Sequence, residues 1–320
     1  MRRRIKPVGP QPDTPRRSNG YNLGMFGSHL SIAGGMYRAI LEAVRLGFQT
    51  VQVFTGNPRQ LQCSQGQLIT KNHQQRESPP QPLDAVLQWQ TECRRARFEK
   101  TVSHASYLIN LASPDEAMWR RSIDAYGEEL RRCSLLGIPY CVIHPGCHMG
   151  AGEQFGISRV AAALDEIHSN VPAGSVLTCL ESTAGQGSSI GHRLEHLAEI
   201  IERVGSARRV GVCLDTAHLF AAGYDFRGRK YSCFVADVQR IIGRSRVKVL
   251  HLNDSKKPLG SRVDRHEHIG HGLIGLTGFR PFVRDSIWSD TPKILETPKE
   301  KAPDGRDWDE VNLESLTSLM

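Results

Sequence analysis

Short apolar runs rich in β-branched residues recur along the chain and alternate with longer segments of helical periodicity. Eight runs have the length and composition of buried strands: 23–29, 50–55, 101–104, 140–144, 176–181, 210–215, 247–251 and 293–296. Helices are expected between them over 36–46, 83–99, 114–136, 157–168, 193–204 and 233–242, with a short last helix within 307–320. Buried strands that alternate with helices are typical of a parallel sheet closed into a barrel. The pattern predicts an α/β protein built as a single (β/α)8 TIM barrel, with its active site at the C-terminal rim of the strands.

The domain organisation follows from the length and from two segments that lack the pattern. A barrel of this kind needs about 250 residues, so the 320 residues of the chain suffice for one barrel with extensions. Residues 1–20 are basic and rich in proline, and we expect a disordered tail there, followed by a catalytic domain over 21–320. Residues 61–82 are rich in Gln, Ser and Pro and are expected to form an irregular surface excursion. No run approaches the roughly 18 apolar residues of a membrane span, so no membrane association is expected.

Seven of the eight predicted strands end in a histidine or a carboxylate. These residues are His29, His104, His144, Glu181, Asp215, His251 and Glu296. A single histidine at a strand end is more often part of the core. Because the carboxyl ends of parallel strands meet at one rim, seven such side chains together predict a cluster of nitrogen and oxygen ligands suited to zinc or a similar divalent ion.

Two further pairs extend this cluster. Asp215 and His218 leave one strand end three residues apart, so they can bind two different ions. Asp264 and His266 lie two apart in a long polar loop after residue 254 and project to the same side if the loop is extended. Taken alone they fit a solvated loop, but His218 offers a third ligand. We find no GxGxxG, Walker or GxSxG motif, so no nucleotide cofactor is expected.

The charge and the cysteine content indicate the cellular compartment but do not identify a binding partner. The net charge is +8, but residues 1–17 hold six Lys and Arg residues against Asp13 alone, which leaves only +3 for the rest. This balance permits an anionic partner without requiring one. The eight cysteines form no CxxC pair, and the N-terminus lacks the apolar stretch of a secretory signal. Both features favour a reducing cytoplasm.

Nine sequence blocks between Met25 and Pro298 carry a family resemblance. They include Gly27-Ser-His-Leu-Ser-Ile-Ala-Gly-Gly35, Phe54–Gln60, His104–Ala112, His144–Gly146, Glu181–Gly187, Cys213–Asp225 and His251–Lys256. The most specific blocks are Gly260-Ser-Arg-Val-Asp-Arg-His266 and Leu295-Glu-Thr-Pro298. In this order and without a missing block, they resemble the signatures of endonuclease IV, the zinc-dependent apurinic/apyrimidinic endonuclease family.

The resemblance implies three zinc ions per chain, with Mn²⁺ possible at one site. The first ion is expected at His104, His144 and Glu181, the second at Glu181, Asp215, His251 and Glu296, and the third at His218, Asp264 and His266. Glu181 bridges the first two ions, and Glu296 is the residue expected to orient the attacking water and take its proton. Glu181 and Glu296 are therefore the implied catalytic residues.

The resemblance also implies an activity in base excision repair. The substrate is double-stranded DNA with an abasic site. The phosphodiester 5′ to that site is hydrolysed to leave a 3′-hydroxyl and a 5′-deoxyribose phosphate, and 3′ blocking groups are removed. Arg59, Tyr107 and Leu108 match the residues that penetrate the duplex. The chain departs from the family at Ser182, usually Asn, and at Ala217, commonly Cys.

Two alternatives remain open from the sequence. A metal-dependent sugar or sugar-phosphate isomerase or epimerase uses the same barrel and rim, but usually one or two ions, so the trio His218, Asp264 and His266 speaks against it. A non-catalytic binder of damaged DNA is the second alternative, and only the intact set of ligands opposes it. A monomer is the expected state for an enzyme that must enclose a duplex.

Overall fold

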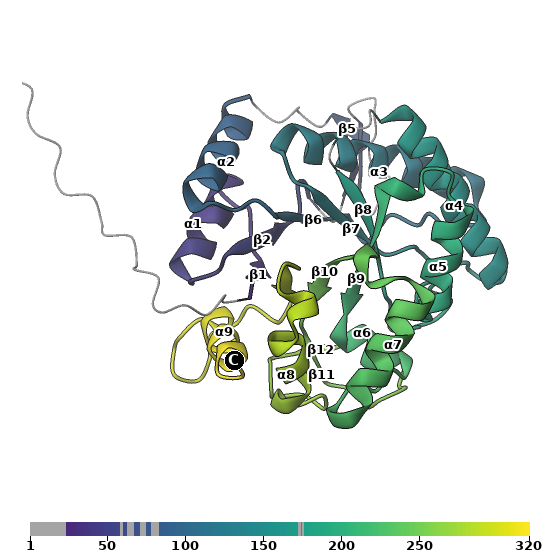
Figure 1. Ribbon diagram of the computed structural model, residues 1–320. Coiled ribbons are helices and arrows are strands. Elements are labelled where there is room, and N and C mark those ends of the chain that lie inside the picture. The colour runs from purple at the N-terminus through teal and green to yellow at the C-terminus, as the bar shows by residue number, and fades with distance from the viewer. Residues whose placement is uncertain are drawn as a thin grey trace, which may run out of the picture.

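The computed structural model describes residues 24–57, 83–171, 174 and 176–320, together with the backbone of three short strands between 60 and 77 (Figure 1). Eight parallel strands close into a barrel in the order β1-β13-β10-β9-β8-β7-β6-β2. Each barrel strand pairs with its neighbours along the chain, and the first pairs with the last, so the predicted (β/α)8 fold is confirmed. The barrel strands are β1 (Phe26–His29), β2 (Thr50–Val53), β6 (Val102–His104), β7 (Tyr140–Ile143), β8 (Leu177–Glu181), β9 (Val210–Asp215), β10 (Val247–His251) and β13 (Lys293–Leu295).

The helices lie outside the ring of strands (Figure 1). They are α1 (Tyr37–Arg45), α2 (Leu83–Ala96), α3 (Glu116–Leu136), α4 (Glu153–Asn170), α5 (Leu194–Arg203), α6 (Thr216–Ala222), α7 (Tyr231–Ile241), α8 (Leu276–Arg284) and α9 (Trp308–Thr317). Single 3-10 turns are η1 (Ala207–Arg209), η2 (Gly228–Lys230), η3 (Arg244–Arg246) and η4 (Ser286–Trp288). The last helix packs on the barrel as expected, because Asp309 of α9 accepts a hydrogen bond of 2.7 Å from the Ser28 hydroxyl of β1.

Helices α6 and α8 were not predicted, and each has a local reason. Helix α6 starts directly after strand β9, because the Asp215 side chain accepts a hydrogen bond from the His218 backbone N–H at 2.7 Å and caps the first turn. Helix α8 contains Gly278 and Pro281, two residues that lower helix propensity. The apolar spacing in both is therefore too short or too interrupted to stand out.

Two segments expected to be irregular contain short antiparallel strands. In the predicted surface excursion 61–82, β3 (Gln60–Gln62), β4 (Gln67–Thr70) and β5 (Gln75–Glu77) form a three-stranded sheet. The expected irregular excursion thus contains paired strands of three or four residues each, which are too short to show a clear periodicity in the sequence. In the long loop after β10, β11 (Asp254–Ser255) pairs with β12 (His266–Glu267). The predicted tail 1–20 lies outside the described residues.

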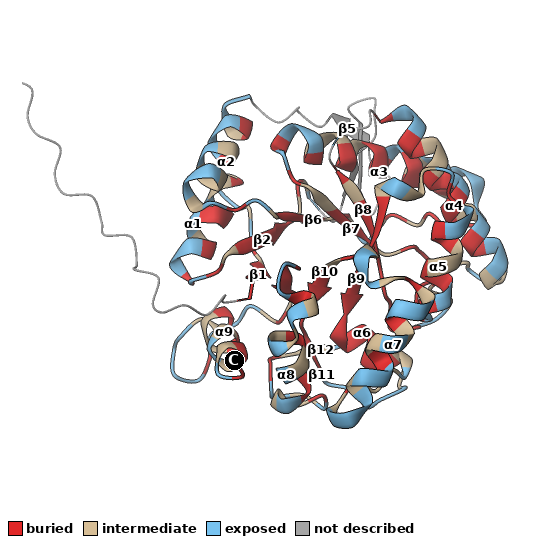
Figure 2. Cartoon of the chain, in the orientation of Figure 1, coloured by how far each residue is buried: buried red, intermediate tan, exposed pale blue. Residues whose placement is uncertain are grey.

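Two layers of apolar side chains support the barrel. Figure 2 shows the strands buried and the outer helix faces exposed. Alternate strand residues face the helices or the barrel axis, and a separate buried cluster fills the axis: Val102, Val142, Cys179, Cys213, Val249 and Ile294. Cys179 and Cys213 thus serve as small buried side chains of the core. Among the described residues, no helix is long and apolar enough to cross a membrane.

Candidate metal centre

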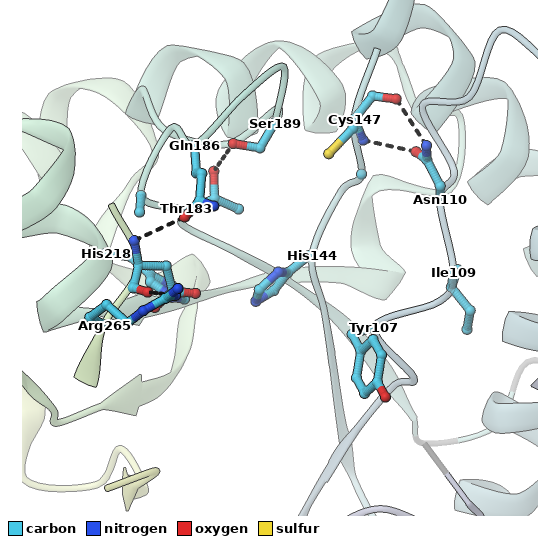
Figure 3. Close-up of a pocket in the computed structure, with 13 residues that line it drawn as sticks. Tyr107, Ile109, Asn110, His144, Cys147, Thr183, Gln186, Ser189, His218 and Arg265 are labelled. Atoms are coloured by element: carbon cyan, nitrogen blue, oxygen red, sulfur yellow. Dashed lines mark hydrogen bonds and ion pairs between the residues drawn. The ribbon is translucent and has the colours of Figure 1, made fainter. Parts of the chain in front are cut away.

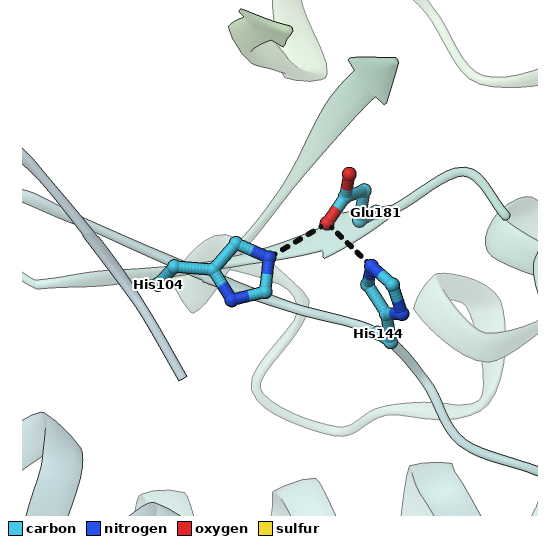
Figure 4. Close-up of side chains that lie close together, drawn as sticks. All are labelled: His104, His144 and Glu181. Atoms are coloured by element: carbon cyan, nitrogen blue, oxygen red, sulfur yellow. Dashed lines mark hydrogen bonds and ion pairs between the residues drawn. The ribbon is translucent and has the colours of Figure 1, made fainter. Parts of the chain in front are cut away.

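The nine predicted ligands lie together at the C-terminal ends of the barrel strands, and we call them the rim cluster. Its first group joins strands β6, β7 and β8. The Nε2 atoms of His104 and His144 each lie 3.0 Å from Oε2 of Glu181 (Figure 4). The His104 Nδ1 donates a hydrogen bond of 2.8 Å to the Ala105 carbonyl, so the Nε2 lone pair faces the carboxylate. Two imidazole nitrogens and a carboxylate oxygen converge here as metal ligands do.

The second group uses the other oxygen of Glu181. Nδ1 of His251 lies 3.0 Å from Glu181 Oε1 and 3.1 Å from Glu296 Oε2. Asp215 Oδ2 lies 3.8 Å from the same nitrogen. Glu181 is fully buried and offers one carboxylate oxygen to each group. This geometry fits the bridging role that the sequence predicts for it.

The third group comes from helix α6 and the loop that leads into β12. Asp264 reaches the Nε2 atoms of His218 and His266 at 3.2 and 3.3 Å, and these two nitrogens lie 3.4 Å apart. The Nδ1 atoms donate to backbone carbonyls, that of His218 to Ser182 at 2.8 Å and that of His266 to Glu296 at 3.2 Å. Both Nε2 lone pairs therefore point at each other and at a carboxylate. Only a cation satisfies that arrangement, whether a proton or a metal ion.

The electrostatics of the rim cluster also favour bound cations. Burial raises the pKa of Glu181, but the positive charges of His144 and His251 outweigh it and hold that pKa well below its usual value. Burial lowers the pKa of His218, but Asp215 and Asp264 outweigh it and hold that pKa well above its usual value. The surroundings of Glu181 and of His218 thus favour a positive charge, which a divalent ion can supply.

Two cavities give access to the rim cluster. The first has a volume of about 470 Å³ and reaches His144, His218 and Asp264. Figure 3 shows Tyr107 on one side of this cavity, Arg265 on the other, and His144 between them. The second cavity, also about 470 Å³, is lined by residues that include His29, Phe54, Glu296 and Lys299. One cavity thus opens at His144, His218 and Asp264, and the other opens at Glu296.

Known proteins share this chain's sequence and architecture. A family model described as a Xylose isomerase-like TIM barrel matches residues 40–318. The probable endonuclease 4 of Chloroflexus aurantiacus is 43% identical over 298 residues, which cover 92% of this chain and 98% of that protein. The probable endonuclease 4 of Geobacter sulfurreducens is 42% identical, with 92% and 94% covered. The crystal structure of endonuclease IV from Thermus thermophilus matches with a TM-score of 0.76 and 32% identity, covering 92% and 98% of the two chains. The chain belongs to the endonuclease IV family.

Sugar epimerases share the fold of the endonuclease IV family. A D-psicose 3-epimerase structure matches with a TM-score of 0.65 at 14% identity, covering 92% of this chain and 97% of that one. Identity this low shows a common barrel and no more. The sequence similarity therefore assigns the chain to the endonuclease IV family and not to the sugar epimerases, a choice that the barrel fold alone leaves open.

The three predicted DNA-contacting residues have different outcomes in this member of the endonuclease IV family. Tyr107 lines the first cavity and its side chain is 54% exposed. Leu108 is partly buried and packs against the core. Arg59 lies outside the described residues. Of the two that are described, Tyr107 is the more exposed.

Three buried polar residues outside the predicted ligand set hold the ligands in place. Asn253 donates to Asp215 Oδ2 at 2.7 Å and accepts from the Glu296 backbone N–H at 2.7 Å. Ser182, a departure from the family pattern, accepts from the Asp215 N–H at 3.0 Å through its hydroxyl. Gln52 of β2 contacts His251 and Glu296. The only signal for Gln52 in the sequence is a polar residue within the apolar run 50–55.

His29 is the one predicted strand-end residue outside the three groups. Its Nδ1 lies 2.9 Å from Gln52 Nε2 and 3.4 Å from Glu296 Oε1. Burial lowers the pKa of His29, so its ring is neutral at neutral pH. His29 therefore supports the ligands from behind, in keeping with its absence from the ligand set that the resemblance implies.

Proposed function

We propose that this protein is a DNA-repair endonuclease that hydrolyses the phosphodiester 5′ to an abasic site in double-stranded DNA. The products are a 3′-hydroxyl and a 5′-deoxyribose phosphate, and 3′ blocking groups are removed by the same centre. One observation carries the proposal: three groups of nitrogen and oxygen ligands lie side by side at the rim, two of them sharing the buried Glu181, in a member of the endonuclease IV family. A sugar enzyme with one or two ions has no use for the third group.

The proposal assigns three zinc ions to the rim cluster. His104, His144 and Glu181 hold the first ion, and His218, Asp264 and His266 hold the third. Glu181, Asp215, His251 and Glu296 hold the second. Imidazole and carboxylate ligands suit zinc, and Mn²⁺ is acceptable at a site rich in oxygen ligands. Bound divalent ions supply positive charge to the phosphodiester and lower the pKa of water from near 16 to about 7.

The protein's own groups complete the chemistry. The Glu296 carboxylate orients the attacking water and accepts its proton. Gln52 Nε2 holds Glu296 Oε1 at 2.6 Å, while Oε2 faces His251. Glu181 is completely buried, so its charge is shielded from bulk water, and its carboxylate would be the ligand shared by the first two ions. Because water is excluded around the buried Glu181, charge interactions with a phosphate that enters through the cavities are stronger than they would be in bulk water.

Recognition of damage is proposed to depend on the three residues that the family resemblance matches to duplex-penetrating positions, of which Tyr107 lines the first cavity. Tyr107 and Leu108, with Arg59, are proposed to enter the duplex where the base is missing. Unstacking costs least at such a position, so selectivity for damage arises without reading sequence. Arg265 is exposed on the far side of the cavity and supplies positive charge for the DNA backbone. A monomer in the cytoplasm remains the proposed setting.

A cleavage assay tests the function. A 5′-labelled duplex with one abasic site is incubated with the protein and resolved on a denaturing gel. We expect one cut 5′ to the lesion, a product that a polymerase extends from its 3′-hydroxyl, loss of cutting with a chelator, and recovery with zinc. An intact duplex of the same sequence is the control. Tight binding without cutting would support the damaged-DNA binder, and epimerisation of a ketose without cutting would support the sugar enzyme.

A further inference from the structure

Gln52 connects strand β2 to side chains at the ends of three other strands. Strand β2 ends without a predicted ligand, yet Gln52 is fully buried at the rim. Its Nε2 lies 2.6 Å from Glu296 Oε1 and 2.9 Å from His29 Nδ1. Its Oε1 lies 2.8 Å from His251 Nε2. One carboxamide therefore uses both N–H groups and its oxygen on residues of a single site.

The orientation of this amide is fixed by charge. An atom 2.6 Å from a carboxylate oxygen must carry a hydrogen, because an amide oxygen there would be repelled. The Nε2 atom of Gln52 therefore faces Glu296, and the Oε1 atom faces His251. An oxygen acceptor requires that His251 Nε2 carry the proton. Nδ1 of His251 is thereby the nitrogen that offers a lone pair when a metal ion takes the place of a second proton.

The tautomer of His251 determines which of its ring nitrogens can bind a metal ion. Nδ1 of His251 is the atom that lies 3.0 Å from Glu181 Oε1 and 3.1 Å from Glu296 Oε2. The tautomer that Gln52 selects is thus the one that aims a lone pair at the second group of the rim cluster. A hydrogen-bond partner behind a ligating histidine fixes its tautomer and orientation in this way.

His29 holds Gln52 from the other side. Its Nδ1 accepts the second N–H of Gln52, so the His29 proton sits on Nε2, a buried atom without a hydrogen-bond partner among the described residues. If the amide turned over, its oxygen would face the Glu296 carboxylate. It would also lose the acceptor on His29. The pair therefore resists reorientation of the amide.

We propose that Gln52 is a positioning residue of the metal centre. It holds His251 with the Nδ1 lone pair toward the second ion, and it holds Glu296 by one oxygen so that the other remains free for the ion. The proposal rests on the proposed function, because it assumes that the rim cluster binds metal. Gln52 itself touches neither DNA nor the reacting atoms.

The variant Gln52→Met keeps the volume and removes all three hydrogen bonds. We expect its affinity for one zinc ion, measured by competition with a chelator, to fall about 10- to 100-fold. The kcat for an abasic duplex should fall, while KM should stay within about twofold because no DNA contact is lost. The matched control is Thr178→Val, which removes a buried hydrogen bond to His168 at the other end of strand β8. It should lower stability and leave zinc affinity unchanged.

Two outcomes overturn the proposal. One is Gln52→Met with the zinc affinity of the parent, although the parent cuts abasic DNA. The other comes from the zinc-loaded parent and needs no variant: a nitrogen-15 histidine spectrum in which His251 carries its proton on Nδ1 and binds through Nε2. The expected spectrum shows the proton on Nε2, close to the Gln52 amide. If the parent itself binds no zinc, the proposed function fails first, and the two failures are thus distinguished.

Discussion

The rim cluster and a second group of side chains contain the same residue types but pair their atoms differently. These other side chains, which we call the helix pair cluster, are Glu153 at the start of α4, His192 just before α5 and His196 within α5. His196 is completely buried, and its Nε2 lies 3.2 Å from Glu153 Oε2. By residue type and distance alone, both clusters qualify as metal sites.

The atoms behind each histidine separate the two clusters. In the helix pair cluster, Nδ1 of His196 accepts the Gly191 backbone N–H at 3.3 Å, so its proton lies on Nε2 and is donated to Glu153. His192 of the same cluster donates from Nδ1 to the Ser189 carbonyl at 3.0 Å, and its Nε2 lies 3.6 Å from Glu153 Oε1. In the rim cluster, His218 and His266 donate from Nδ1 to backbone carbonyls, so their Nε2 lone pairs face the site. The Glu153 carboxylate thus has one proton donor, His196, without any cation, whereas the facing lone pairs of His218 and His266 call for one. The hydrogen-bond partner of the ring nitrogen that points away from the cluster therefore says more about metal binding than the residue type does.

The largest expected difference between the clusters appears in the cleavage rate when one carboxylate charge is removed from each. Glu296→Gln should keep the fold and the affinity for abasic DNA but lose turnover by several orders of magnitude, since the group that orients the water is gone. Single-turnover cleavage of an abasic duplex measures this. Glu153→Gln is the matched variant in the helix pair cluster and should cut at the parental rate. Near-normal cleavage by Glu296→Gln, or a dead Glu153→Gln, would break the comparison.

The next largest effect concerns the binding of damaged DNA and not the catalytic step. Tyr107→Ala removes an exposed ring at the first cavity and should reduce the preference for abasic over intact duplex by about 1–3 kcal/mol. Competition binding with undamaged DNA measures the preference, and zinc content serves as the control because it should not change. An unchanged preference would mean that Tyr107 is ordinary rim packing.

A change in the helix pair cluster should act on stability alone. His196→Gln breaks a buried hydrogen-bonded pair and should lower the free energy of unfolding by about 1–3 kcal/mol. Denaturant unfolding with a chelator present gives this value. The zinc content and kcat of the folded variant should match the parent. Loss of a zinc ion in this variant would show that the cluster binds metal after all.

A third buried histidine provides the simplest titration. His168 bonds to Ser206 and Thr178 away from both clusters, and burial lowers its pKa from 6.5 to about 4. The folded state therefore keeps His168 neutral while the unfolded state binds a proton below pH 6.5. Stability from this group is complete above pH 6.5 and is lost as the pH falls toward 4. Between pH 6.5 and 5 the loss is roughly 1–2 kcal/mol.

The measurement for this titration compares variants in a chelator, so that bound metal plays no part. The midpoint of thermal unfolding is followed from pH 7 to pH 5 for the parent and His168→Gln. The parent should lose more stability than the variant over this range. Equal slopes would show that His168 is protonated in the folded state.

The sequence predicts the barrel and the rim because both depend on local patterns. Each strand is a short apolar run, and residues such as Glu181 and His251 mark its end, so barrel closure brings them together. Gln52 and Asn253 could not be selected in this way, because their partners lie on strands distant in the sequence and only the register joins them. Helix α8 was missed because Pro281 interrupts its pattern. Tertiary contacts, not local propensity, determine these features.

The central claim is that the rim cluster, and not the helix pair cluster, binds metal. Native mass spectrometry of protein stripped with a chelator and reloaded with zinc tests it most directly. We expect three ions per chain in the parent, three in Glu153→Gln, and fewer in Glu181→Gln, which loses the shared ligand. One ion in the parent, or a count that falls in Glu153→Gln and not in Glu181→Gln, would contradict the account.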